Sequence, residues 1–146
     1  MEKNYQKYQT YKSAMEQINA AIEAGFFLEA ITIEESIFAD RVFRLCKNNG
    51  YSRPYDRATL GHELKFIRDK KLDQVEDFPF PYLEELDLFW SRRNNCLHQI
   101  AKSEPGTPTQ DYSTTMSLAE KTAKDGKQVV NKVSKWVIKN KKNSGF

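Results

Sequence analysis

Cysteine and histidine are scarce in this chain, which has only two of each among its 146 residues. Cys46 and Cys96 are 50 positions apart, and no CxxC or HxxxH pair occurs, so the ligand spacing of a zinc site is missing. We expect two free thiols, although the spacing also allows a disulfide. Acid–base catalysis at neutral pH has only His62 and His98 to use. The sequence therefore predicts no bound metal and no other cofactor.

Long hydrophobic runs are also missing. No stretch approaches the roughly 18 to 20 apolar residues that a membrane-spanning helix needs, and the polar residues 1–5 do not resemble a secretory leader. Charged residues make up 29% of the chain, and the mean hydropathy is −0.73. Because these values are typical of soluble, helix-rich proteins, we expect a cytoplasmic protein that does not enter a membrane.

The small net charge of +3 is distributed unevenly along the chain. Residues 1–111 carry a net charge of −3, whereas residues 112–146 carry +6, all of it from lysine. A cationic C-terminal helix attracts polyanions through electrostatic steering and counterion release. The same lysines also suit an ordinary solvated helix face, so this charge does not establish nucleic-acid binding by itself.

Apolar residues recur at intervals of three and four, which predicts helices and no strand. Gly25 and the proline-containing loops 50–57, 73–81 and 103–110 separate the helical segments. Five helices are expected, over residues 3–24, 27–48, 59–72, 81–102 and 111–139. Such helices with short connections give an all-α, up-and-down bundle. We expect a single domain, residues 1–146, that ends in a basic helix over about residues 112–141.

Arg93 is a charged residue on the apolar stripe of the fourth predicted helix. That stripe comprises Leu83, Leu86, Trp90, Leu97 and Ile100. Arginine keeps its proton, so its burial requires an acid or an anion beside it. A polar stripe lies alongside, formed by Asp87, Ser91, Asn94 and His98. Asn94 and His98 are four residues apart and close enough to touch. Arg93 and His98 are five apart, about 140° round the helix, so they would flank one groove.

Two adjacent glutamates of the second predicted helix are candidates for the acid. Glu34 lies on the apolar stripe, three residues after Ile31 and three before Ile37, and Glu35 follows it. A carboxylate near Arg93 would keep the arginine paired, and one near the histidine would orient the imidazole. Alternatively, both glutamates are ordinary exposed helix acids.

Residues 93–98, Arg-Asn-Asn-Cys-Leu-His, resemble the R-x4-6-H motif of the HEPN superfamily (higher eukaryotes and prokaryotes nucleotide-binding domains). In that family a polar residue, often asparagine, follows the arginine, and the motif lies on a late helix of a small all-α bundle. Residues 25–30, Gly-Phe-Phe-Leu-Glu-Ala, are similar to the turn that joins the first two HEPN helices. The resemblance spans about residues 10–140.

A second arginine and histidine with the R-x4-H spacing occur at Arg57 and His62. This copy begins in a loop, carries Ala58 after the arginine and includes Gly61. We therefore interpret it as coincidental and assign the functional pair to the copy on the fourth helix.

The resemblance implies a metal-independent endoribonuclease that cleaves RNA by attack of the 2′-hydroxyl. His98 would then be the general acid or base and Arg93 the phosphate clamp, with Asn94 orienting the histidine or binding phosphate. Glu35 or Glu34 would support them. A homodimer would bring two motifs together, and an antitoxin or other regulatory partner fits the toxin and phage-defence roles of this family.

One departure from the family concerns its control. Many HEPN toxins have a tyrosine two residues after the motif histidine, which a nucleotidyltransferase antitoxin adenylylates. Ile100 occupies that position here, so this form of control is not expected.

Two other functions remain open from the residues alone. One is a non-catalytic helical module for dimerisation or for nucleotide or RNA binding. The other is a lysine-driven nucleic-acid binder that uses residues 121–142.

Overall fold

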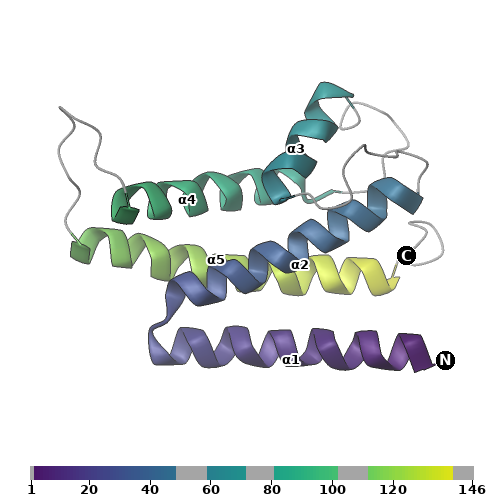
Figure 1. Ribbon diagram of the computed structural model, residues 1–146, viewed down its shortest axis with the longest axis horizontal. Coiled ribbons are helices and arrows are strands. Elements are labelled where there is room, and N and C mark those ends of the chain that lie inside the picture. The colour runs from purple at the N-terminus through teal and green to yellow at the C-terminus, as the bar shows by residue number, and fades with distance from the viewer. Residues whose placement is uncertain (1, 49–58, 72–80, 102–111, 140–146) are drawn as a thin grey trace.

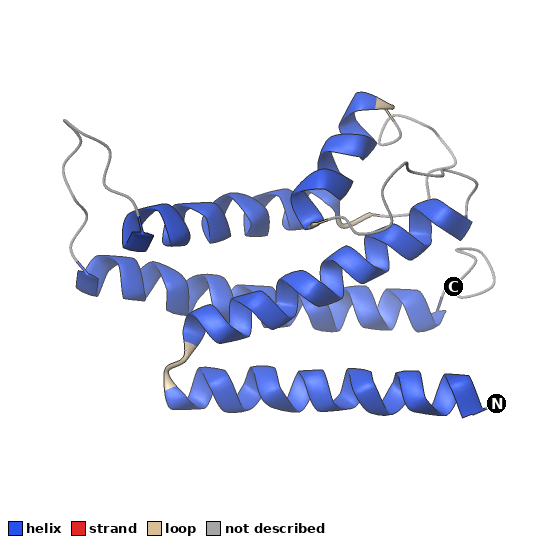
Figure 2. Ribbon diagram, in the orientation of Figure 1, coloured by secondary structure: helices blue, strands red, loops and turns tan. Residues whose placement is uncertain are grey.

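Five helices make up almost all of the described part of the chain. A computed structural model describes residues 2–48, 59–71, 81–101 and 112–139. Its helices are α1 (Glu2–Ala24), α2 (Phe27–Asn48), α3 (Leu60–Asp69), α4 (Leu83–Ala101) and α5 (Tyr112–Lys139). None of these residues forms a strand, as Figure 2 shows. The all-α prediction is confirmed.

The four long helices α1, α2, α4 and α5 alternate in direction along the chain (Figure 1). Helix α5 packs against both α2 and α4, and α1 packs against α2. The short helix α3 contacts α2 and α4 and is steeply inclined to the other helices. The arrangement is the expected up-and-down bundle, with α3 as an addition at one end.

The turn between α1 and α2 is a Schellman motif. Gly25 has a φ of +81°, a left-handed conformation that glycine adopts without steric cost. Its N–H donates to the carbonyl of Ile22 at 3.1 Å, and the N–H of Phe26 donates to the carbonyl of Ala21 at 2.8 Å. The last carbonyls of α1 are thereby satisfied, so the helix ends where the sequence predicts.

The ends of α3 and α4 differ from the prediction by a few residues. Helix α3 ends at Asp69, and its predicted last residue, Leu72, lies outside the described residues. Helix α4 begins at Leu83, so Pro81 precedes the helix instead of occupying its first turn. The carbonyl of Tyr82 accepts the first helical hydrogen bond, from the N–H of Leu86 at 3.1 Å. Differences of this size are usual at helix ends.

The buried face of α4 differs from the predicted stripe. Leu97 is 37% exposed, whereas its neighbour Cys96 is fully buried. Over residues 83–98 of this helix, the buried residues are Leu86, Phe89 and Cys96. Cys96 meets Thr122 of α5, with Sγ and Oγ1 4.0 Å apart. Leu86 is buried as predicted, but Phe89 and Cys96 are buried in place of the predicted Trp90 and Leu97. The side chain of Ile100 lies outside the described residues.

The core is formed by the apolar faces of all five helices. The predicted stripe of α2 is buried at Ala30, Ile31, Ile37, Phe38, Val42 and Leu45. Phe38 meets Phe89 of α4 edge to face, with ring centroids 4.9 Å apart. Cys46 and Cys96 are both buried, and both are free thiols, as predicted. None of the helices in the described residues is long and apolar enough to cross a membrane.

Candidate functional site

Arg93 of α4 points toward α2, where it pairs with Glu35. Its Nε donates to Oε2 of Glu35 at 2.9 Å. The side chains are 27% and 15% exposed, respectively, so the pair is partly withdrawn from water. Of the two acids that the sequence left open, Glu35 is the partner of Arg93. The interpretation of Glu35 as an ordinary exposed acid is wrong.

Two further contacts fix the orientation of the Arg93 guanidinium. Its Nη1 donates to Oδ1 of Asn94 at 2.9 Å. Its Cζ lies 4.7 Å from the ring centroid of Trp90, which is one helical turn earlier on α4. The indole in turn packs against Gly61 of α3, where a Cβ atom would overlap it. Three helices thus contribute to the placement of one guanidinium.

This arrangement leaves part of the guanidinium available to a ligand. Arginine has five N–H donors, and the bonds to Glu35 and Asn94 use two of them. The remaining donors have no hydrogen-bond partner within the described part of the chain and form a fork suited to phosphate oxygens. The amide oxygen of Asn94 accepts its hydrogen bond from Arg93, so in this structure Asn94 orients the arginine.

His98 is exposed in the last turn of α4. No hydrogen bond or ion pair joins its ring to Arg93, Asn94, Glu35 or any other described residue. Neither His98 nor Arg93 lines the three cavities that lie between α1 and α2, between α3 and α4, and between α4 and α5 in the described residues. One chain therefore places the imidazole and the guanidinium on the same helix but does not join them.

Glu34, next to Glu35, is a core residue with no exposed surface. Its carboxyl packs against Gly126 of α5 and near Phe89 of α4, and a Cβ at position 126 would overlap it. Neither carboxyl oxygen has a hydrogen-bond partner among the described residues. Burial raises the pKa of Glu34 to about 9, and the Lys127 ammonium opposes this shift. Glu34 is therefore protonated at neutral pH and is not the acid beside Arg93.

His62 lies at the start of α3. Its backbone N–H donates to Oγ1 of Thr59, the N-cap residue, at 3.3 Å, and its Nδ1 lies 3.3 Å from the same hydroxyl. Arg57, its partner in the second copy of the motif spacing, lies outside the described residues. The described contacts of His62 are those of a helix cap.

Trp90 and Gly61 are the site residues whose roles the sequence reasoning missed. By sequence, Trp90 belongs to the apolar stripe of the fourth predicted helix, and Gly61 to a coincidental copy of the motif spacing. The spacing of three residues between Trp90 and Arg93 was the available signal, because side chains at i and i+3 of a helix are neighbours. No signal in the sequence indicated that Gly61 would face the indole.

The basic helix α5 is partly neutralised in its first half. Lys124 pairs with Glu120 at 2.8 Å, and Lys121 lies 3.8 Å from Asp125. Asp125 also accepts a hydrogen bond from Arg92 of α4 at 2.8 Å. The exposed lysines of the second half are Lys132, Lys135 and Lys139. Positive charge is therefore concentrated toward the C-terminal end of the helix.

A metal site is not formed by the residues that the structure describes, since no three His, Cys, Asp or Glu side chains cluster there. No protein-family model matches the sequence, and neither a curated protein nor a solved structure matches it. The function is therefore inferred from the side-chain geometry and from the motif at residues 93–98.

Proposed function

We propose that the protein is a metal-independent endoribonuclease of HEPN type that acts on RNA as a homodimer. The observation that supports this proposal most strongly is the placement of Arg93. It is held by Glu35, Asn94 and Trp90, and its other N–H donors have no partner among the described residues. The same helix presents the exposed His98.

The proposed reaction is transfer of the phosphoryl group within the RNA strand. A base removes the proton of the 2′-hydroxyl, and the 2′-oxygen forms a bond to the adjacent phosphorus. The bond from phosphorus to the 5′-oxygen breaks, and an acid protonates that oxygen. The products are a 2′,3′-cyclic phosphate and a 5′-hydroxyl. No metal is required, because a guanidinium can stabilise the charge on the phosphorus oxygens.

Each residue has a defined role in this scheme. His98 transfers protons, because an imidazole can both accept and donate a proton through its ring nitrogens. Arg93 binds the phosphate oxygens through the donors that Glu35 and Asn94 leave free. Glu35 and Trp90 are positioning residues that hold the guanidinium in place. The Arg93–Glu35 pair reduces the local net charge, so binding relies on directed N–H donors rather than on a strong field.

A dimer resolves the need for both an acid and a base. One chain supplies one histidine in this region, and the reaction uses two proton-transfer groups. An isologous dimer about a two-fold axis near α4 would supply two copies of His98 and two of Arg93. We propose that such a toxin-like or phage-defence enzyme acts in the cytoplasm and is controlled by an antitoxin or another regulatory partner.

The test is RNA cleavage in excess EDTA, with analysis of the product ends. Wild type should produce cyclic-phosphate ends, and His98→Gln and Arg93→Ala should each lower the rate about 100-fold or more. His62→Gln and Arg92→Ala are matched controls, the other histidine and the adjacent ion-paired arginine, and should retain activity. The mass of the same samples in solution should be that of a dimer. Cleavage that persists in both His98→Gln and Arg93→Ala would refute the assignment.

A non-catalytic RNA-binding module is the second candidate. The exposed lysines of the second half of α5 favour this function, because residues 126–139 contain no aspartate or glutamate. In that case RNA binding survives His98→Gln, no cleavage occurs, and affinity falls steeply with salt.

A further inference from the structure

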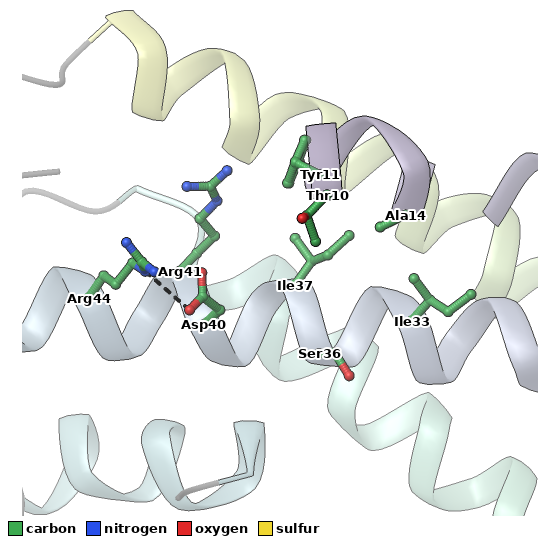
Figure 3. Close-up of a pocket in the computed structure, with 9 residues that line it drawn as sticks. All are labelled: Thr10, Tyr11, Ala14, Ile33, Ser36, Ile37, Asp40, Arg41 and Arg44. Atoms are coloured by element: carbon green, nitrogen blue, oxygen red, sulfur yellow. Dashed lines mark hydrogen bonds and ion pairs between the residues drawn. The ribbon is translucent and has the colours of Figure 1, made fainter. Parts of the chain in front are cut away.

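A groove lies between α1 and α2 (Figure 3). Helical periodicity places its α2 residues on the side of that helix opposite Glu35. Glu35 and Arg44 are nine residues apart, which is two and a half helical turns, so their side chains project from opposite sides of α2. The groove has a volume of about 410 Å³, a size typical of small-molecule sites. We call it the α1–α2 groove and define it by Tyr11, Ala14, Ile33, Ile37, Arg41 and Arg44.

The two ends of the α1–α2 groove differ in chemistry. Figure 3 shows Ala14 and Ile33 at one end and the two arginines at the other. Ile37 lies between them, and no charged side chain lines the groove near Ala14 and Ile33. Such a surface suits an apolar chain, because its burial removes hydrocarbon from water.

Among the described residues that line the groove, the charged end has one more positive than negative side chain. Arg44 pairs with Asp40 at 3.1 Å, so these two charges largely cancel. Arg41 instead lies over the ring of Tyr11, with Cζ 4.8 Å from the ring centroid. Burial raises the pKa of Tyr11, with Arg41 opposing this shift, so the phenol stays neutral and does not balance the arginine. Arg41, Arg44 and Asp40, the charged residues of the described lining, therefore sum to a net charge of +1.

Arg41 also has an unsatisfied donor. Its Nε is buried and has no hydrogen-bond partner among the described residues. A buried N–H without an acceptor is costly, and a charged acceptor forms the strongest bond to it. A monoanion with a carboxylate at this end would satisfy both the donor and the charge. A dianion would be disfavoured, since Asp40 lies beside the same end.

We propose that the α1–α2 groove binds an aliphatic monocarboxylate, with its head on Arg41 and its alkyl chain along Ile37, Ile33 and Ala14. Ile33 and Arg41 are eight residues apart, about 12 Å along α2. Three chain bonds span roughly 3.5 Å when extended, so about ten bonds fill this length. A medium-chain fatty acid has these dimensions. The site lies on the opposite side of α2 from Arg93, so it is independent of the proposed RNA cleavage.

The first experiment titrates the full chain with decanoate in a calorimeter, below the concentration at which decanoate forms micelles. Decanoate should bind saturably, with a dissociation constant of about 1 mM or lower. Decyltrimethylammonium has the same tail with a cationic head, and acetate has the head without the tail. Each should bind at least roughly 10-fold more weakly, because one lacks the charge match and the other lacks the apolar burial.

The second experiment uses variants of the groove. Arg41→Met keeps an unbranched stem, removes the charge, and should weaken decanoate binding roughly 10-fold or more. Ala14→Phe fills the apolar end and should abolish binding, while circular dichroism checks that the helices are intact. Lys47→Met removes an exposed charge of the same helix outside the groove and should change affinity less than about two-fold. Absence of saturable binding to folded wild type would overturn the proposal. Wild-type affinity in both Arg41→Met and Ala14→Phe would also overturn it.

Discussion

Glu34 provides a sharp test of the packing between α2 and α5. Its buried carboxyl has no hydrogen-bond partner in the described part of the chain, and such a group links stability to pH. The perturbation is Glu34→Gln, which keeps the size and shape of the protonated side chain but removes its ionisation. The neutral form of Glu34 occupies the space left by Gly126, so the amide should fit the same site. The variant should therefore fold like the wild type at low pH.

The sign of the effect follows from the direction of the pKa shift. Burial raises the pKa of Glu34 from 4.5 to about 9. Below pH 4.5 the carboxyl is neutral in both states, and its ionisation does not affect stability. Between pH 4.5 and 9 only the unfolded state loses the proton, so the wild-type free energy of unfolding falls as pH rises. Each pH unit in this window corresponds to about 1.4 kcal/mol, which sets an upper bound of about 4 kcal/mol at pH 7.5.

The assay is urea denaturation followed by circular dichroism at several pH values between 4.5 and 9. Glu34→Gln should match wild type at pH 4.5 and become increasingly more stable than wild type toward pH 7.5. Glu16→Gln, the same substitution on an exposed position of α1, is the control and should change stability by less than about 0.5 kcal/mol. A gain below about 1 kcal/mol for Glu34→Gln between pH 4.5 and 7.5 would refute the reasoning, since that is less than one unit of pKa shift.

Two other substitutions test close contacts between helices. Gly126→Ala should destabilise the fold by about 1–3 kcal/mol, because the new methyl overlaps Glu34 and Phe89. The cost of this overlap outweighs the higher helix propensity of alanine. Thermal unfolding measures the change in stability, and an unchanged or higher melting temperature would contradict the contact. Gly61→Ala should displace the Trp90 indole, lower stability by a similar amount and alter Trp fluorescence. If Trp90 positions Arg93 as proposed, Gly61→Ala should also slow RNA cleavage by the folded protein, and wild-type cleavage with a displaced indole would refute that positioning role.

The helices themselves were predictable from the sequence, because their signals are local. Apolar spacing defined the stripe of α2, and Gly25 marked the end of α1 through a conformation that needs glycine. The chain also suggested that Arg93 required an acid, since a charged group on an apolar stripe must be paired. These inferences depend on neighbours within one or two helical turns.

Only the tertiary structure decided which residues meet across helices. Adjacent residues on a helix point about 100° apart, so the rotation of α2 determines that Glu35 reaches Arg93 while Glu34 enters the core. The contact of α4 with α5 likewise buries Cys96 and exposes Leu97. The α1–α2 groove and the packing of Gly61 on Trp90 also arise only where separate helices come together. Spacing along one helix defines its faces, but the neighbour that each face meets depends on how all the helices pack together.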